Sequence, residues 1–224
     1  MVKVGFRLVF IGIETPEEES LKECNKNQNK NRDLLLSVKI MQNAGLQVTA
    51  GFIVGFDSDT PTTFQRQIDF IQQSGIVTAM VGLLNAPKKT KLYSRLESEN
   101  RIVSEASGNN TDLYLNYIPM MNPEELVKGY KKIIGGIYNA EPYDRRFRQL
   151  LLNYNPKPNR SAVIGAAACW VFLKSFFVLG VLDMGRKHYW KLLLWTLFKR
   201  PQLLEDVVTL SIYGLHYRKI FEIL

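Results

Sequence analysis

Residues 51–60 read GFIVGFDSDT, and this stretch decides how the first half of the chain folds. An apolar run from Val48 to Val54 ends at Gly55, which opens into a short acidic loop before Thr60 and the proline that follows it. A short apolar run between turn signals is typical of a buried strand, and threonine followed by proline is typical of a helix start. The stretch therefore predicts a buried strand that leads through a glycine turn into a helix, an arrangement at which α/β proteins hold cofactors.

The same alternation of strand and helix patterns occurs three times before residue 100. Apolar runs at 7–13 and 76–84 flank the central run, and a helical pattern follows each of them. Such alternation favours βα units and a parallel sheet. Three units over 7–100 are too few to close a barrel, so we predict an open α/β unit.

The pattern changes after residue 102. Residues 103–120 are polar and irregular, the pattern beyond them is purely helical, and a linker rich in proline and asparagine lies at 155–159. Clusters of these residue types between periodic segments indicate loops. We therefore predict two domains, an α/β unit over 1–102 and an all-α unit over 103–224.

The charge of the chain is unevenly placed. The net charge is +8, and residues 1–100 carry 12 Lys+Arg against 11 Asp+Glu, whereas residues 101–224 carry 17 against 10. A basic half can meet nucleic acid or an anionic membrane surface. The basic residues are scattered rather than clustered, which favours a solvated helical face and argues against nucleic acid.

Two features bear on localisation. The N-terminal residues lack the apolar run of a signal peptide, and Cys24 and Cys169 are too far apart to suggest a disulfide framework or a metal site, so we expect a cytoplasmic protein. The most apolar segment, 162–182, is long enough to cross a bilayer, but Lys174 at its middle favours a buried or interfacial helix. Peripheral contact with a membrane therefore stays open.

Candidate binding residues lie at the ends of the first two predicted strands. Gly12 and Gly55 remove side chains where a ligand plane must approach the backbone. Glu14 places a carboxylate there for a ribose hydroxyl or an ammonium group, and Phe52 and Ile53 offer apolar surface to a flat ring. Parallel strands end at one edge of the sheet, where ligands gather. The alternative is that these glycines serve only as turn and packing residues.

Other polar residues indicate chemistry less clearly. Asp57 and Asp59 could act as an acid/base pair or a metal site, but turn formation and helix capping are the commoner roles of such a loop. His188 and His216 have no partners at metal-ligand spacing. The residues alone therefore predict neither a catalytic group nor a metal ligand.

Three stretches together carry a family resemblance: VFIGIETP at 9–16, GFIVGFDSDT at 51–60 and MVGLLNAPKKT at 80–90. They resemble the radical SAM enzymes and, more closely, the B12-binding (cobalamin-dependent) radical SAM proteins with a helical C-terminal extension of unknown function (DUF4070-type). That group includes hopanoid methylases and other methyltransferase-like members. The resemblance is strong over residues 8–102 and looser through the helices that follow.

The resemblance implies a partial (β/α)6 barrel, of which this chain resembles strands four to six, the C-terminal half. It also implies part of a site for S-adenosylmethionine at the strand ends. The residues it assigns to that site are, strand by strand, Gly12, Glu14 and Thr15, then Gly51, Ile53 and Gly55, then Leu84 and Asn85.

The chain departs from the family pattern in several places. The CxxxCxxC triplet that binds the [4Fe-4S] cluster, the glycine motif of strand two and the cobalamin-binding domain are absent from these residues, so we expect neither cluster nor cobalamin to bind this chain. Lys89 stands where the family usually has glycine. Without preceding strands, the strand at 7–13 would present an unpaired edge, and the electron that the cluster supplies would be lacking.

Two functional hypotheses follow. The first is the C-terminal portion of a cobalamin-dependent radical SAM enzyme of methyltransferase type, acting on a small-molecule or lipid substrate and inactive by itself. A separate polypeptide would carry the N-terminal barrel half, unless the chain is a truncated remnant. The second is a non-catalytic membrane-surface or protein-interaction module that uses the basic and aromatic segment 142–224.

Overall fold

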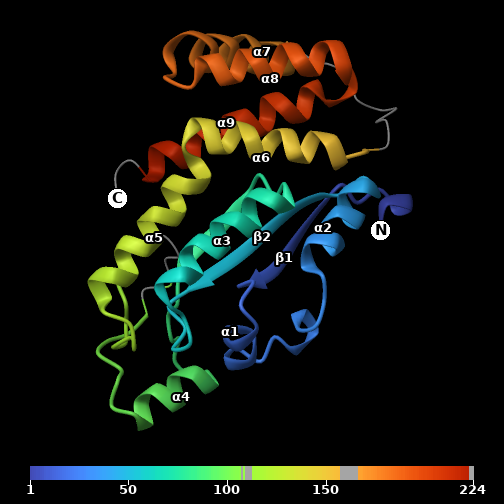
Figure 1. Ribbon diagram of the computed structural model, residues 1–224. Helices are drawn as coiled ribbons and strands as arrows, with labels where there is room; N and C mark the ends of the chain where they lie inside the picture. Colours follow the sequence, from blue (N-terminus) through green and yellow to red (C-terminus); the bar gives the residue numbers. More distant parts are fainter. Residues whose placement is uncertain (107, 109–112, 157–165, 222–224) are drawn as a thin grey trace.

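The computed structural model describes residues 1–106, 108, 113–156 and 166–221. Strands alternate with helices in the first part of the chain, and only helices follow the third strand (Figure 1). The strands are β1 (Leu8–Glu14), β2 (Gln47–Val54) and β3 (Ala79–Leu83). The helices are α1 (Glu18–Glu23), α2 (Leu34–Asn43), α3 (Pro61–Ser74), α4 (Lys91–Ser98), α5 (Pro123–Tyr138), α6 (Ala140–Asn153), α7 (Ala166–Phe177), α8 (Arg186–Lys199) and α9 (Leu204–Phe221).

The three strands form one parallel sheet in the order β1-β2-β3. Helices connect them, as parallel pairing requires. The prediction of an α/β unit followed by helices is confirmed. An open three-stranded sheet is compatible with part of a barrel, but the barrel itself stays a prediction.

The two faces of the central strand differ in burial. Val48, Ala50, Phe52 and Val54 are buried and belong to the main hydrophobic core, whereas Ile53 on the opposite face is only half-buried. Successive side chains of a strand point to opposite faces, so the face with Gln47, Gly51 and Ile53 is only partly covered, although Thr49 on it is buried.

The helix starts follow the local sequence signals. At α3, Thr60 and Thr63 form a reciprocal capping box, and the helix ends at Gly75 with a φ of 68°. At α5, the Asn122 side chain accepts hydrogen bonds from the backbone N–H groups of the next turn, at 2.9 and 3.3 Å. These contacts satisfy helix-end donors that would otherwise lack partners, and the start predicted at Thr60 is confirmed.

Helices α3, α5, α6, α7, α8 and α9 lie in layers on one side of the sheet, and α1 and α4 lie apart from these layers (Figure 1). Helices α5 and α6 pack against α3, α9 packs against α5 and α8, and α7 and α8 lie farthest from the sheet. One continuous hydrophobic core extends from β1 through α9. Within the segment predicted as a domain boundary, Tyr117 pairs with Ile102 and donates a hydrogen bond to the carbonyl of Gly55 just after β2, and the boundary itself stays a prediction.

Helix α6 lies at the start of the basic and aromatic segment 142–224, but its Arg146 turns inward and is fully buried. Its guanidinium donates hydrogen bonds to the backbone carbonyls of Ile137 (2.7 Å) and Val77 (3.1 Å). It also lies over the rings of Tyr138 and Tyr143. A buried cation needs such partners, so this arginine joins the start of β3 to the helices instead of forming a solvated face.

The apolar segment 162–182 contains α7 and a π-helical turn, Val178–Leu182, while residues 162–165 lie outside the described part of the chain. Lys174 is exposed. Among the described residues, no helix has the length and apolar content needed to cross a membrane.

Candidate functional site: the open face of the sheet at its carboxyl edge

The carboxyl ends of β1, β2 and β3 meet at one edge because the strands are parallel. Near this edge, Gly12 lies opposite Gly51, which in turn lies opposite Met80. Two residues further along β2, Ile53 lies opposite Gly82. Two neighbouring strands thus place glycines side by side on the same face.

This face of the sheet is open to solvent. Phe10 and Met80 point into it and are 56% and 45% exposed, although both are large apolar residues. A Cβ atom added to Gly51 would lie 3.1 Å from Cζ of Phe10, so the Phe10 ring lies over the glycine. The glycine leaves room for the ring, and the open face presents exposed apolar groups, which suit contact with another flat ring.

An ion pair lies over the other glycine. A β-bulge between Gly12 and Glu14 gives Glu14 a φ of 65°, and its carboxylate lies 2.7 Å from Nζ of Lys26. A Cβ at Gly12 would be 2.5 Å from Oε1 of Glu14 and 2.9 Å from Lys26 Nζ. Asn29 donates hydrogen bonds to the carbonyls of Gly12 (3.1 Å) and Ile13 (3.2 Å) and so holds the end of the strand. A carboxylate and an ammonium group thus face the open surface together.

The other residues assigned to the first and second strand ends have structural contacts. Thr15 is fully buried, and its hydroxyl accepts a hydrogen bond from Glu17 N–H at 3.2 Å. Gly55 has a φ of 111°, a left-handed value that favours glycine, and its carbonyl accepts a 2.5 Å hydrogen bond from the hydroxyl of Tyr117. These contacts support the alternative that Gly55 is a turn and packing residue.

The loop after β3 has one polar atom without a partner. Leu84 is buried, whereas Oδ1 of Asn85 is buried at the atom level and accepts no hydrogen bond in the described structure. The amide group of Asn116 holds the loop by two bonds to the backbone of Ala86, at 2.9 and 2.8 Å. A buried acceptor without a donor costs free energy, so Asn85 is positioned to accept a hydrogen bond from a ligand or a water molecule.

The two aspartates of the loop after β2 have different roles. Asp59 accepts hydrogen bonds from the N–H groups of Gly55 (2.8 Å) and Phe56 (3.1 Å), which confirms the turn interpretation, and burial raises its pKa. Asp57 forms no cap. Burial acts to raise the pKa of Asp57, but ion pairs with Arg101 and Arg95, both at 2.6 Å, outweigh it and lower the pKa. Both aspartates stabilise the loop, and neither is free for acid/base chemistry.

The structure thus brings Gly12, Glu14, Gly51, Ile53 and Asn85 to one edge of the sheet, and it buries the remaining predicted residues beneath that edge. Sequence reasoning missed three residues on the same face, Phe10, Lys26 and Met80. Alternation along the strands places Phe10 and Met80 on the face of the glycines. Lys26 has no such signal, because its pairing with Glu14 depends on the path of the loop between β1 and α2.

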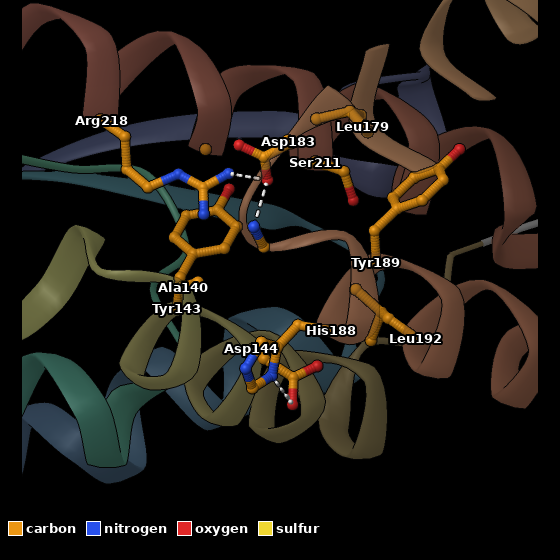
Figure 2. Close-up of a pocket in the computed structure, with 12 residues that line it drawn as sticks. Ala140, Tyr143, Asp144, Leu179, Asp183, His188, Tyr189, Leu192, Ser211 and Arg218 are labelled. Carbon is orange, nitrogen blue, oxygen red and sulfur yellow. Dashed lines mark hydrogen bonds and ion pairs between the residues drawn. The ribbon is translucent and has the colours of Figure 1, made fainter. Parts of the chain in front are cut away.

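A second concave region lies between α6, α8 and α9 (Figure 2). Figure 2 shows His188 beside Asp144, with Nδ1 of the histidine 3.6 Å from the carboxylate, and Arg218 bonded to Asp183 at 2.9 Å. His188 therefore has a partner that the sequence did not reveal. The cavity is about 40 Å³, room for about one water molecule, so it is too small for an organic ligand.

Within the described residues, no group of three or more histidine, cysteine, aspartate or glutamate side chains could hold a metal ion. The side chain of Cys24 is half-buried near Glu14, and that of Cys169 lies outside the described side chains. The described residues therefore do not fit an iron–sulfur cluster.

Comparison with known proteins identifies the family. Residues 90–224 match the family described as a domain of unknown function, DUF4070. The chain belongs to the DUF4070 family. The uncharacterized methyltransferase sll1242 of Synechocystis sp. is 33% identical over the whole of this DUF4070 chain, which covers 42% of that relative. The hopanoid C-2 methylase of Rhodopseudomonas palustris is 27% identical over 94% of the chain, and 39% of its own length is covered.

A more distant relative is the bacteriochlorophyllide d C-12(1)-methyltransferase of Chlorobaculum tepidum, 26% identical over 67% of this chain and covered over 33% of its length. The DUF4070 chain thus spans less than half of the relatives it matches. These matches confirm the resemblance to the B12-binding radical SAM proteins. No solved structure matches the chain significantly.

Proposed function

We propose that the chain is the C-terminal part of a cobalamin-dependent radical SAM methyltransferase and contributes one wall of the S-adenosylmethionine site. The observation that carries the proposal is the juxtaposition of Gly12 and Gly51 on the open face at the carboxyl edge. Barrel enzymes bind their ligands at that end of the strands. The relatives that are named methylase or methyltransferase support the reaction class.

In this proposal the open face of the sheet is the inner face of a partial (β/α)6 barrel. Among the described strands, β1 pairs only with β2, so its other edge is available for a further strand. Leu8 and Phe10 are exposed on this strand, as expected for side chains that another part of the protein covers. That part would be the N-terminal barrel half, in the same protein or in a separate polypeptide.

Several described residues support part of a site for S-adenosylmethionine. The exposed Phe10 ring over Gly51, with Ile53 beside it, offers an apolar surface for the adenine ring, and Asn85 Oδ1 is an acceptor without a donor. The carboxylate of Glu14 can accept hydrogen bonds from ribose hydroxyls while Lys26 holds it in place. When bound, S-adenosylmethionine supplies the methyl and radical chemistry that side chains lack.

The contribution of this chain is binding and orientation. Gly51 leaves room for the Phe10 ring of the proposed adenine surface, and Gly12 leaves room for the Glu14–Lys26 ion pair, which fixes the carboxylate at the strand end. The described residues do not provide the cysteine ligands of an iron–sulfur cluster, so we propose that other residues of the assembled enzyme hold the cluster and the cobalamin. By itself the chain is expected to be inactive.

A chimera tests the proposal. Residues 1–224 replace the matching part of the Synechocystis relative, and S-adenosylmethionine binding is measured by equilibrium dialysis under anaerobic conditions. Gly51→Val places a branched side chain on the proposed adenine surface and should weaken binding at least about tenfold, which corresponds to 1.4 kcal/mol. Gln47→Val is the matched control, because it lies on the same face of β2 but about 13 Å from Gly51 along the strand, and should change affinity less than about twofold.

Two results would contradict the proposal. The first is equal affinity in the Gly51→Val and Gln47→Val chimeras. The second concerns the isolated chain: reconstitution with iron, sulfide and S-adenosylmethionine is expected to give no 5′-deoxyadenosine, and its formation would show that the chain is a complete enzyme.

A further inference from the structure

The layer of helices farthest from the sheet has an unusual distribution of side chains. It consists of α7, the π-helical turn Val178–Leu182 and α8 (Figure 1). The two helices touch through Phe176 and Trp190, whose ring centroids are 4.6 Å apart, and Trp190 donates a 2.9 Å hydrogen bond to Gly180. The layer is therefore a packed unit with a defined outer surface.

Helix α7 carries its large apolar side chains on the outside. Trp170, Leu173 and Phe177 are 68%, 60% and 57% exposed, and their spacing of three and four residues places them on one face of the helix. The inner side holds Phe172, which packs against the core, and Ser175, which is buried and donates a hydrogen bond to the backbone carbonyl of Phe172 at 2.8 Å. Helix α7 is thus apolar on both sides, whereas a surface helix of a water-soluble domain is polar on its outer face, so this outer face is expected to meet another apolar phase.

Helix α8 adds cations to the same layer. Its inner face holds Leu192 and other buried residues, whereas Lys187, Lys191, Leu194 and Phe198 recur at four- and three-residue spacing on its exposed side. Phe198 is 78% exposed. We call the set Trp170, Leu173, Phe177, Leu194 and Phe198 the outer apolar face, and Lys174, Lys187 and Lys191 its basic residues.

The charge of this layer has one sign. Residues 166–200 contain six lysines and arginines and one acidic residue, Asp183. The carboxylate of Asp183 is largely buried and forms an ion pair with Arg218 at 2.9 Å, so it contributes little negative charge to the surface. Among residues 166–200, the helices that carry the outer apolar face thus expose lysines and arginines but no acidic side chain apart from the paired Asp183.

We propose that the outer apolar face docks the protein onto an anionic membrane surface. Apolar and aromatic side chains enter the interface between headgroups and acyl chains, and lysines beside them bind anionic headgroups. A membrane fits this surface better than a second copy of the chain, because pairing two copies would bring Lys174, Lys187 and Lys191 together with their counterparts. Since no described helix is suited to cross a bilayer, the docking is peripheral.

Vesicle flotation of the full chain tests the proposal. Vesicles of phosphatidylcholine with about one-third phosphatidylserine are expected to carry the protein at low salt, and vesicles of phosphatidylcholine alone to carry much less. Raising the salt towards 1 M shortens the screening length to about 3 Å and should release the protein from the vesicles. Because Trp170 is exposed, its fluorescence should shift to shorter wavelength on binding.

Two variants separate the apolar and the basic contributions. Lys187→Glu with Lys191→Glu should reduce the partition coefficient at least about 25-fold, since each cation near an anionic surface contributes about fivefold. Trp170→Ser with Phe177→Ser should abolish binding to both vesicle types. All four side chains are exposed, so the variants are expected to fold.

Matched controls lie on α2 and α5. Lys39→Glu with Lys128→Glu makes the same change in net charge, and Leu36→Ser with Ile40→Ser likewise replaces two exposed apolar side chains by serine. Both controls should keep vesicle binding within about twofold of the unmodified chain.

Three outcomes would overturn the proposal. One is failure of the unmodified chain to float with anionic vesicles, and another is equal loss of binding in the control variants. The third is a dimer in solution that the Trp170→Ser, Phe177→Ser variant converts to a monomer, which would identify the face as an interface between two copies of the chain.

Discussion

The close contact between α5 and α3 gives the sharpest test of how the helices are held on the sheet. Gly129 of α5 faces the ring of Phe64 on α3, and a Cβ added at Gly129 would overlap three atoms of that ring. Carbon atoms in contact are about 3.5–4.0 Å apart, so Gly129→Ala forces the buried ring to move. Gly135 lies on the same helix, where an added Cβ would meet only Nδ2 of Asn139, at an ordinary 3.7 Å.

The change in the free energy of unfolding caused by Gly129→Ala is the sum of two opposing contributions. Alanine is about 1 kcal/mol more favourable than glycine inside a helix. Overpacking a well-packed core costs about 1–3 kcal/mol, and the overlap with Phe64 places Gly129→Ala towards the upper end of that range. We therefore expect Gly129→Ala to lower the free energy of unfolding by about 1–2 kcal/mol, and Gly135→Ala to raise it by about 0.5–1 kcal/mol.

Urea denaturation followed by circular dichroism measures both effects on the full chain. A change of 1 kcal/mol moves the melting temperature of a chain of this size by about 2–4 °C, so thermal melts give a second reading. A double-mutant cycle with Phe64→Leu isolates the contact. If overlap with the Phe64 ring causes the loss of stability, Gly129→Ala should destabilise the Phe64→Leu variant less than it destabilises the unmodified chain. The coupling energy between the two substitutions should be at least about 0.5 kcal/mol.

The reasoning is refuted if Gly129→Ala is as stable as Gly135→Ala, or if the cycle shows no coupling between residues 129 and 64. Either result would mean that α5 does not approach α3 as closely as the structure shows.

Three further predictions concern loops and carboxylates. Lys89 has a φ of 68°, so Lys89→Gly should relieve strain and raise the free energy of unfolding by about 1 kcal/mol; an unchanged urea midpoint would contradict this. Burial raises the pKa of Asp206 to about 6, so the folded chain holds this proton more tightly than the unfolded chain. The free energy of unfolding should then fall as pH rises from about 4 to about 6. Urea titrations at several pH values measure this fall, and Asp206→Asn should remove the contribution of Asp206 to it. Asp57→Asn should cost about 1–2 kcal/mol at pH 7 through the bonds to Arg95 and Arg101. Because the pKa of Asp57 is lowered, this difference should disappear as pH falls below about 4, and a difference independent of pH would contradict the ion-pair explanation.

Much of the fold could be predicted from the sequence because its signals are local. The apolar run before Gly55 marks β2, and Thr60 and Asn122 mark helix starts by the hydrogen bonds their side chains make to nearby backbone. The candidate site was predictable in part, since glycines at the ends of successive parallel strands must meet at one edge. Asp59 makes the turn hydrogen bonds that its loop predicts, whereas the ion pairs of Asp57 were not predictable, because its arginine partners lie about forty residues further along the chain.

The sequence by itself therefore determined the order of strands and helices, the parallel sheet and the glycines at its carboxyl edge, because backbone periodicity and turn residues act over a few positions. Only the tertiary structure decided which charges and rings meet. It placed Lys26 against Glu14 and Phe10 over Gly51, and it buried Arg146. These contacts join residues whose distance in space depends on how whole elements pack, and no local pattern records that packing.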